Sequence, residues 1–128
     1  MAGRSLAIVE RAWRGGVEEQ YAHILWLARI LKRMRSDIGV LLRGNAVGYA
    51  VRNAMPCRVQ IAGIQLDSIH QLDTAVADLL ADGVPVHVSE DDRHRLGIAP
   101  ELIVPGVVRV DPPGIARLWQ SYDRIWYW

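Results

Sequence analysis

The sequence predicts an α/β protein of three layers, α/β/α, in which a mostly parallel five-stranded sheet lies between helices. One pattern in the sequence carries this prediction. Short runs of apolar residues alternate along the chain with longer segments whose apolar residues recur with the helical period. Strands that alternate with helices in this way become parallel neighbours in one sheet, and the connecting helices cover its faces. The 128 residues are enough for one domain, and no linker or repeat divides residues 1–128.

Five segments have the composition of strands. Asp37–Leu42 is nearly continuous in apolar residues, which is typical of a strand covered on both faces. Pro85 permits a strand to begin but not a helix to continue, and Gly83 before it suits the left-handed residue just past a helix end. The segment Arg58–Leu66 alternates only weakly, so it is either a short strand or an ordered loop. The predicted strands are Ser5–Val9, Asp37–Leu42, Val86–Ser89, Val107–Val110 and Asp123–Trp128.

The longest predicted helix is Val17–Met34. Its core stripe contains Val17, Tyr21, Ile24, Ala28 and Leu31. Trp26 and Ile30 are four residues apart and lie outside this stripe, so they form a separate apolar ridge. Either another helix of the same subunit or a second subunit covers that ridge. The other predicted helices are Ala46–Asn53 with Asn45 as its N-cap, Ile69–Ala81 capped by Asp67 or Ser68, a helix over Asp91–Leu96, a short turn opened by Ile98–Pro100, and Ile115–Tyr122.

Composition excludes several classes of function. The formal net charge is +1, so no electrostatic argument favours nucleic acid as a partner. No apolar stretch approaches the ~20 residues of a transmembrane helix, and no secretory signal is recognisable. The single cysteine, Cys57, allows no intrachain disulfide. Neither glycine-rich phosphate-binding motif is present, so we expect a cytoplasmic protein that binds no cofactor and no membrane.

The carboxyl ends of the strands are the first place to look for a site, because ligands collect there in open α/β sheets. Ser89 ends the strand that follows Pro85, and an acidic turn comes directly after it. The loops after the first two strands hold an arginine, a tryptophan and an asparagine. The candidate ligand-binding residues are therefore Arg11, Trp13, Asn45, Ser89, Glu90 and Asp91.

Two more reactive interpretations compete with this one. His87, His94 and the carboxylates of residues 90–92 crowd one short segment, but they spread around a strand end and a helix start. Acidic residues there are explained by helix capping, which we favour over a metal site. Cys57 is flanked by Arg52 and Arg58, which would lower a thiol pKa, but a lone cysteine is more often buried and inert.

The order of these pieces resembles a known family. The stretches that carry the resemblance are residues 16–21 at the start of the long helix, 40–47, 79–89, 95–98, 103–107 and the closing 122–128. Together they resemble the DsrE/DsrF/DsrH-like proteins, which are small α/β proteins of sulfur relays and sulfur oxidation. The resemblance covers nearly the whole chain.

The resemblance implies a five-stranded, mostly parallel sheet and homo- or hetero-oligomers, often trimers or hexamers. In active members, a cysteine at the end of the third main strand carries persulfide sulfur. The matching position here is Ser89, and Cys57 lies in a different segment. Several family subunits lack the carrier cysteine and serve as structural or docking partners, and this sequence is similar to that type.

Three functional hypotheses follow. The first is an oligomeric accessory component of a sulfur-relay or sulfur-oxidation system that has no carrier cysteine of its own and docks related subunits or a sulfur-carrier protein. The second is a sulfur carrier or transferase that uses Cys57. The third is a small-ligand-binding module at the strand carboxyl ends. In all three, Trp26 and Ile30 are the candidate subunit interface.

Overall fold

The computed structural model describes residues 3–10, 22–52, 59–66 and 72–128. Five parallel strands form one sheet in the order β6-β5-β2-β1-β7. Its strands are β1 (Ser5–Val9), β2 (Ile38–Leu42), β5 (Val86–Ser89), β6 (Val108–Val110) and β7 (Arg124–Tyr127). The helical elements are α1 (Ala22–Arg33), the 3-10 helix η2 (Gly44–Ala50), α2 (Leu72–Ala81), α3 (Glu90–Arg95), the 3-10 turn η3 (Pro100–Leu102) and α4 (Pro112–Gln120). The predicted fold class is confirmed.

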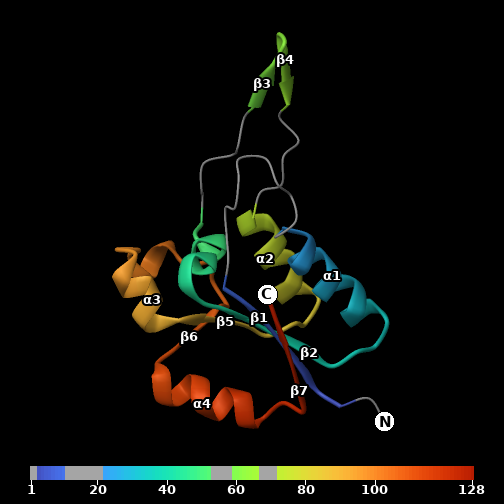
Figure 1. Cartoon of the computed structure of the whole chain (residues 1–128), viewed down its shortest axis with the longest axis vertical. Helices are drawn as coiled ribbons and strands as arrows, with labels where there is room; N and C mark the ends of the chain where they lie inside the picture. Colours follow the sequence, from blue (N-terminus) through green and yellow to red (C-terminus); the bar gives the residue numbers. More distant parts are fainter. Residues whose placement is uncertain (1–2, 11–21, 53–58, 67–71) are drawn as a thin grey trace.

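Helices cover both faces of this sheet. In Figure 1, α1 and α2 lie on one side of the strands together with η2, and α4 lies on the other side. Alternate residues of each strand point to opposite faces. Val40, Leu42, Val86 and Val88 therefore join the core under α1 and α2, whereas Leu41 joins Leu6, Ile8 and Tyr122 under α4. All five residues of β2 are buried, as its continuous apolar run predicts.

The described part of α1 has a wider buried face than the predicted stripe. Ile24 and Ala28 are buried as predicted, and Leu31 is partly buried, but Leu25 is also buried. A helix that packs against both the sheet and a neighbouring helix buries more than one row of side chains. Arg29 closes this contact from the rim, because it pairs with Asp78 and Asp82 at the end of α2.

The segment before Gly83 ends as predicted. Gly83 has a φ of 84°, in the left-handed region. Its N–H donates to the Leu80 carbonyl, and the Val84 N–H donates to the Leu79 carbonyl. This pair of bonds satisfies carbonyls that the end of α2 would otherwise leave open, and it turns the chain into β5.

The predicted cap at Asn45 is wrong. The helix after β2 is a 3-10 helix that begins at Gly44 with Arg43 in the N-cap position, and no side chain of that residue caps it. Asn45 is exposed. The physical reason is that Asp92, from α3, accepts a hydrogen bond from the Gly44 N–H at 2.7 Å. A distant carboxylate therefore satisfies a donor at the helix start that a local cap would otherwise take.

The ambiguous segment forms a hairpin. β3 (Val59–Ile61) and β4 (Ile64–Leu66) pair antiparallel in a sheet of their own, which stands apart from the larger sheet in Figure 1. Ala62 and Gly63 connect them with φ values of 51° and 78°. Two consecutive positive φ angles are typical of the type I′ turn, whose twist matches that of paired strands. Arg58 and the predicted caps Asp67 and Ser68 lie outside the described residues.

The last helix begins earlier than predicted. α4 starts at Pro112 rather than Ile115, since proline is tolerated in a first helical turn. Asp111 caps it and accepts a hydrogen bond from the Gly114 N–H at 2.8 Å. The helix ends beside Tyr122, whose ring lies against Gly39 of β2. A Cβ at Gly39 would come within 2.8 Å of the Tyr122 Cζ, so this contact requires glycine. Within the described residues, no helix is long and apolar enough to cross a membrane.

Candidate functional site at the carboxyl ends of β2 and β5

Ser89 ends β5 and begins α3. Its side chain accepts a hydrogen bond from the Asp92 N–H at 3.3 Å, and the residue is only 4% exposed. A serine in this position satisfies one of the free N–H groups at a helix start. The sheet order places β2 beside β5 and leaves β1 two strands away. The neighbours of Ser89 in the sheet are therefore the ends of β2 and β6, and not the end of β1.

Asp92 ties two helices together. One carboxylate oxygen accepts from the Gly44 N–H, and the other lies 3.4 Å from the Arg95 guanidinium. Burial alone would raise the pKa of Asp92. The hydrogen bonds from Gly44 and Ser89, with the charge of Arg95, outweigh burial and lower that pKa below its usual 3.8.

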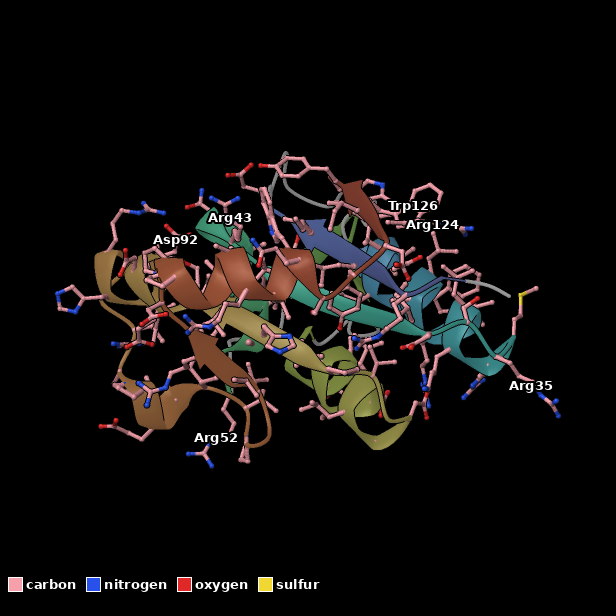
Figure 2. All side chains as sticks on the ribbon, turned by 90° about the horizontal axis from the view of Figure 1, so that it is seen from below. Arg35, Arg43, Arg52, Asp92, Arg124 and Trp126 are labelled. Carbon is pink, nitrogen blue, oxygen red and sulfur yellow. The ribbon has the colours of Figure 1, made fainter. Side chains whose placement is uncertain are left out.

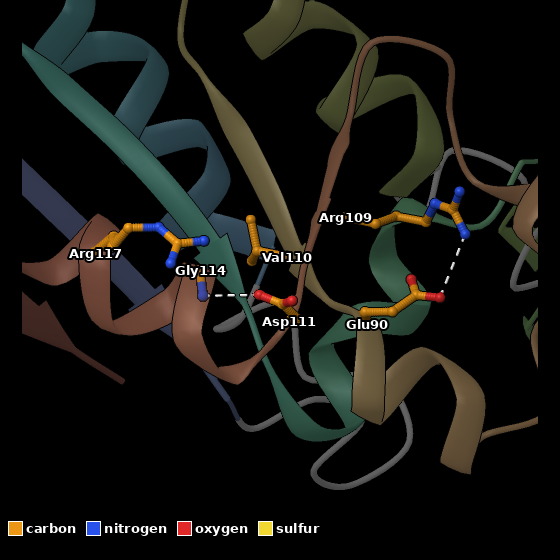
Figure 3. A pocket seen from close by; sticks show the side chains of 6 residues that line it. All are labelled: Glu90, Arg109, Val110, Asp111, Gly114 and Arg117. Atoms are coloured by element: carbon orange, nitrogen blue, oxygen red, sulfur yellow. Dashed lines mark hydrogen bonds and ion pairs between the residues drawn. The ribbon is translucent and has the colours of Figure 1, made fainter.

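Glu90 and Arg93 form a second closed contact in the same turn. The Arg93 Nε donates to Glu90 Oε2 at 3.0 Å, and its Nη1 donates to the Ile98 carbonyl. Arg109 on β6 also reaches Glu90, at 3.3 Å. The hydrogen bond from Arg93 lowers the pKa of Glu90. Figure 3 shows Glu90 and Arg109 on one side of a pocket of ≈ 510 Å³, with Asp111 and Arg117 on the α4 side.

Arg43 is the residue after β2, and it is only partly buried. Strand parity puts it on the same face of the sheet as Leu41, which is the face that α4 covers. Among the described residues, its Nε is the one buried side-chain polar atom that has no hydrogen-bond partner. Figure 2 shows Arg43 and Asp92 at the same end of the sheet.

A pocket of ≈ 380 Å³ lies where these elements meet. Its polar lining comes from the ends of β2 and β5, and α4 supplies an apolar wall. The lining residues are Arg43, Ser89, Asp91, Asp92, Pro112, Ile115, Ala116 and Trp119.

The structure brings together some of the predicted ligand-binding residues and separates others. Ser89 and Asp91 line this pocket, whereas Glu90 lines the neighbouring one. Asn45 lines neither of them, and Arg11, Trp13 and Cys57 lie outside the described residues. Sequence reasoning missed Arg43 and Trp119. Arg43 had a usable signal, because the alternation of β2 places residue 43 on the face opposite Leu42.

The histidines and carboxylates of this turn do not gather. Within the described ranges, no group of three or more histidine, cysteine or acidic side chains could hold a metal ion. His87 points to the α4 side of β5, with Nδ1 3.4 Å from the Val40 carbonyl. Burial lowers the pKa of His87. The acidic residues 90–92 occupy the first turn of α3, where they complement the helix dipole.

Comparison with known proteins identifies the fold. The sequence matches no protein-family model and no curated protein. The structure is similar to the crystal structure of the ychN protein from E. coli, with a TM-score of 0.76, 20% identity, and coverage of 98% of this chain and 99% of that one. It is also similar to BT1422 from Bacteroides thetaiotaomicron, a conserved protein of unknown function, with a TM-score of 0.63, 14% identity, and coverage of 97% and 94%. These likenesses support a DsrE-like fold.

Proposed function

We propose that this chain is an accessory, oligomer-forming component of a sulfur-relay or sulfur-oxidation system and carries no persulfide of its own. The observation that supports this most is the state of Ser89. Where the resembled family places a carrier cysteine, this chain has a buried hydroxyl that caps α3. A carrier forms an S–S bond through a thiolate, and a serine oxygen cannot form that bond.

The surroundings of Ser89 agree with a structural role. The carboxylates of Glu90 and Asp92 are engaged by Arg93, Arg109, Arg95 and the Gly44 N–H, and together these contacts fix the turn. A thiolate at residue 89 would share its pocket with the Asp92 carboxylate, whose pKa is lowered and which therefore keeps its negative charge. Like charges disfavour a thiolate.

The oligomer part of the proposal rests on exposed apolar side chains. Trp26 on α1 is 55% exposed, so no described element of the chain covers it, and Ile30 one turn later is half-buried. Leu27 on the same helix and Met34, the residue after its end, are also exposed apolar residues. Contiguous apolar surface of this kind marks an interface. The assembly is a homo-oligomer of trimer or hexamer type, or a hetero-oligomer with related subunits.

Persulfide transfer tests the sulfur part of the proposal. The protein is incubated with a cysteine desulfurase and L-cysteine, and the intact mass is measured. We expect no added sulfur on the wild type beyond what the Cys57→Ser variant shows. A gain of one sulfur atom that is lost in Cys57→Ser would contradict the proposal and favour the carrier hypothesis.

Light scattering tests the assembly. We expect the wild type to be oligomeric at micromolar concentration and Trp26→Asp to dissociate, because a charge would then lie in the apolar contact. Leu102→Asp is the matched control, since Leu102 is an exposed apolar residue on η3, away from α1. A monomeric wild type, or equal effects of the two substitutions, would contradict an interface on α1.

A further inference from the structure

The pocket between β2, β5 and α4 has three chemically distinct parts. The first is the Arg43 guanidinium. Its Nε–H is buried and has no acceptor, and no hydrogen bond or ion pair within the described residues engages the side chain. An unsatisfied buried donor is costly, and a charged donor more so than a neutral one. A carboxylate is the acceptor that best fits a guanidinium, because it can bind Nε–H and an Nη–H together.

The second part is the Asp91 carboxylate on the rim. Asp91 is exposed, and no described hydrogen bond or ion pair engages its side chain. It differs from Asp92, whose two oxygens are taken by Gly44 and Arg95. The pocket therefore offers an available negative group at its mouth and an available positive group within it.

The third part is the apolar wall. Pro112, Ile115 and Ala116 of α4 line the pocket, and Trp119 is 41% exposed beside them. A tryptophan left this exposed next to polar groups provides a flat surface for an apolar ligand group. The volume of ≈ 380 Å³ suits a small molecule rather than a peptide or a nucleotide chain.

We propose that this pocket binds a small zwitterion, a free α-amino acid with an apolar side chain. Arg43 binds the carboxylate, Asp91 binds the ammonium group, and the α4 wall packs against the side chain. A simple inorganic anion fits less well, because Asp91 and Asp92 repel it and it has no apolar group to pack against the α4 wall. This binding goes beyond the proposed accessory function and does not depend on sulfur transfer.

The test is isothermal titration of the full chain with four probes. They are L-leucine, glycine, N-acetyl-L-leucine, which lacks the ammonium group, and L-leucinamide, which lacks the carboxylate. We expect L-leucine to bind, and each of the other three to bind at least about tenfold more weakly. Equal binding of N-acetyl-L-leucine would overturn the zwitterion assignment. No binding of L-leucine at about 10 mM would overturn the site itself.

Variants then assign the two charged groups. Arg43→Lys keeps a positive charge but loses the guanidinium fork, and Asp91→Asn removes the rim charge. Each substitution should lower the affinity for L-leucine by about tenfold or more. Arg117→Gln, on the neighbouring pocket, should leave the affinity unchanged. Asp91 is exposed, so its variant stays folded even where Arg43→Lys does not. Unchanged affinity in Asp91→Asn would contradict the proposal. The persulfide assay does not measure amino-acid binding. The amino-acid site and the proposed accessory function can therefore be contradicted independently of each other.

Discussion

Two turns follow neighbouring strands at the same edge of the sheet, and each contains an arginine whose side chain is bonded in a different way. After β5, the Arg93 side chain is paired with Glu90 and with the Ile98 carbonyl. After β2, the Arg43 side chain has a buried Nε–H with no acceptor. The first arrangement contributes to folding, because each charge has a partner. The second leaves the Arg43 Nε–H without an acceptor within the described residues. An unsatisfied buried donor is rare in folded proteins and is explained by a bound ligand or by strain.

The largest effect should separate the two arginines. Arg93→Met removes a nearly buried partner, leaves Glu90 with Arg109 alone, and takes away the donor to the Ile98 carbonyl, so we expect a loss of about 2–3 kcal/mol in the free energy of unfolding. Arg43→Met loses no described protein hydrogen bond, and its cost should stay within about 0.5 kcal/mol. Urea denaturation of both variants measures this. Equal destabilisation by the two substitutions would show that Arg43 and Arg93 contribute equally to folding, which would contradict this comparison.

A smaller effect should separate two adjacent carboxylates. Asp92→Ala removes the contacts with Gly44 and Arg95, and the expected cost is about 1–2 kcal/mol. Asp91→Ala is the matched control, because Asp91 is exposed and unpaired in the described structure, and its cost should be below about 0.5 kcal/mol. If thermal and urea unfolding placed both variants at the same stability, Asp92 would not be the link between α3 and η2.

Acid should weaken the turn after β5. The pKa values of Glu90 and Asp92 are lower in the folded chain than their usual 4.5 and 3.8. The unfolded chain therefore binds more protons, and the stability from these contacts is complete above the usual values and is lost as pH falls through the lowered ones. Between about pH 6 and about pH 3, the urea midpoint of Asp92→Ala should fall less than that of the wild type. A parallel fall would contradict the assigned pKa direction.

The sequence predicts the sheet well, because its strands are fixed by local apolar runs. Val86–Ser89 and the left-handed Gly83 follow from residue type alone. The site is less predictable, since its contacts join segments that are distant in sequence. Asn45 has the composition of a cap, but Asp92 takes that role from 47 residues further on, counting from 45 to 92. Trp119 reaches the pocket only because α4 crosses the sheet face below Arg43 and Ser89.

The most direct test of the central claim is the thiol pKa of a Ser89→Cys variant, measured by pH-dependent alkylation in a Cys57→Ser background. The claim is that the strand end at residue 89 is a structural turn and not a site for sulfur chemistry. Burial and the carboxylate of Asp92, which lines the same pocket, disfavour a thiolate there, and we expect them to outweigh the charge of Arg43. We predict a pKa at or above the ordinary value of about 8.5. A pKa clearly below that value would contradict the account and indicate a pocket still suited to a persulfide carrier.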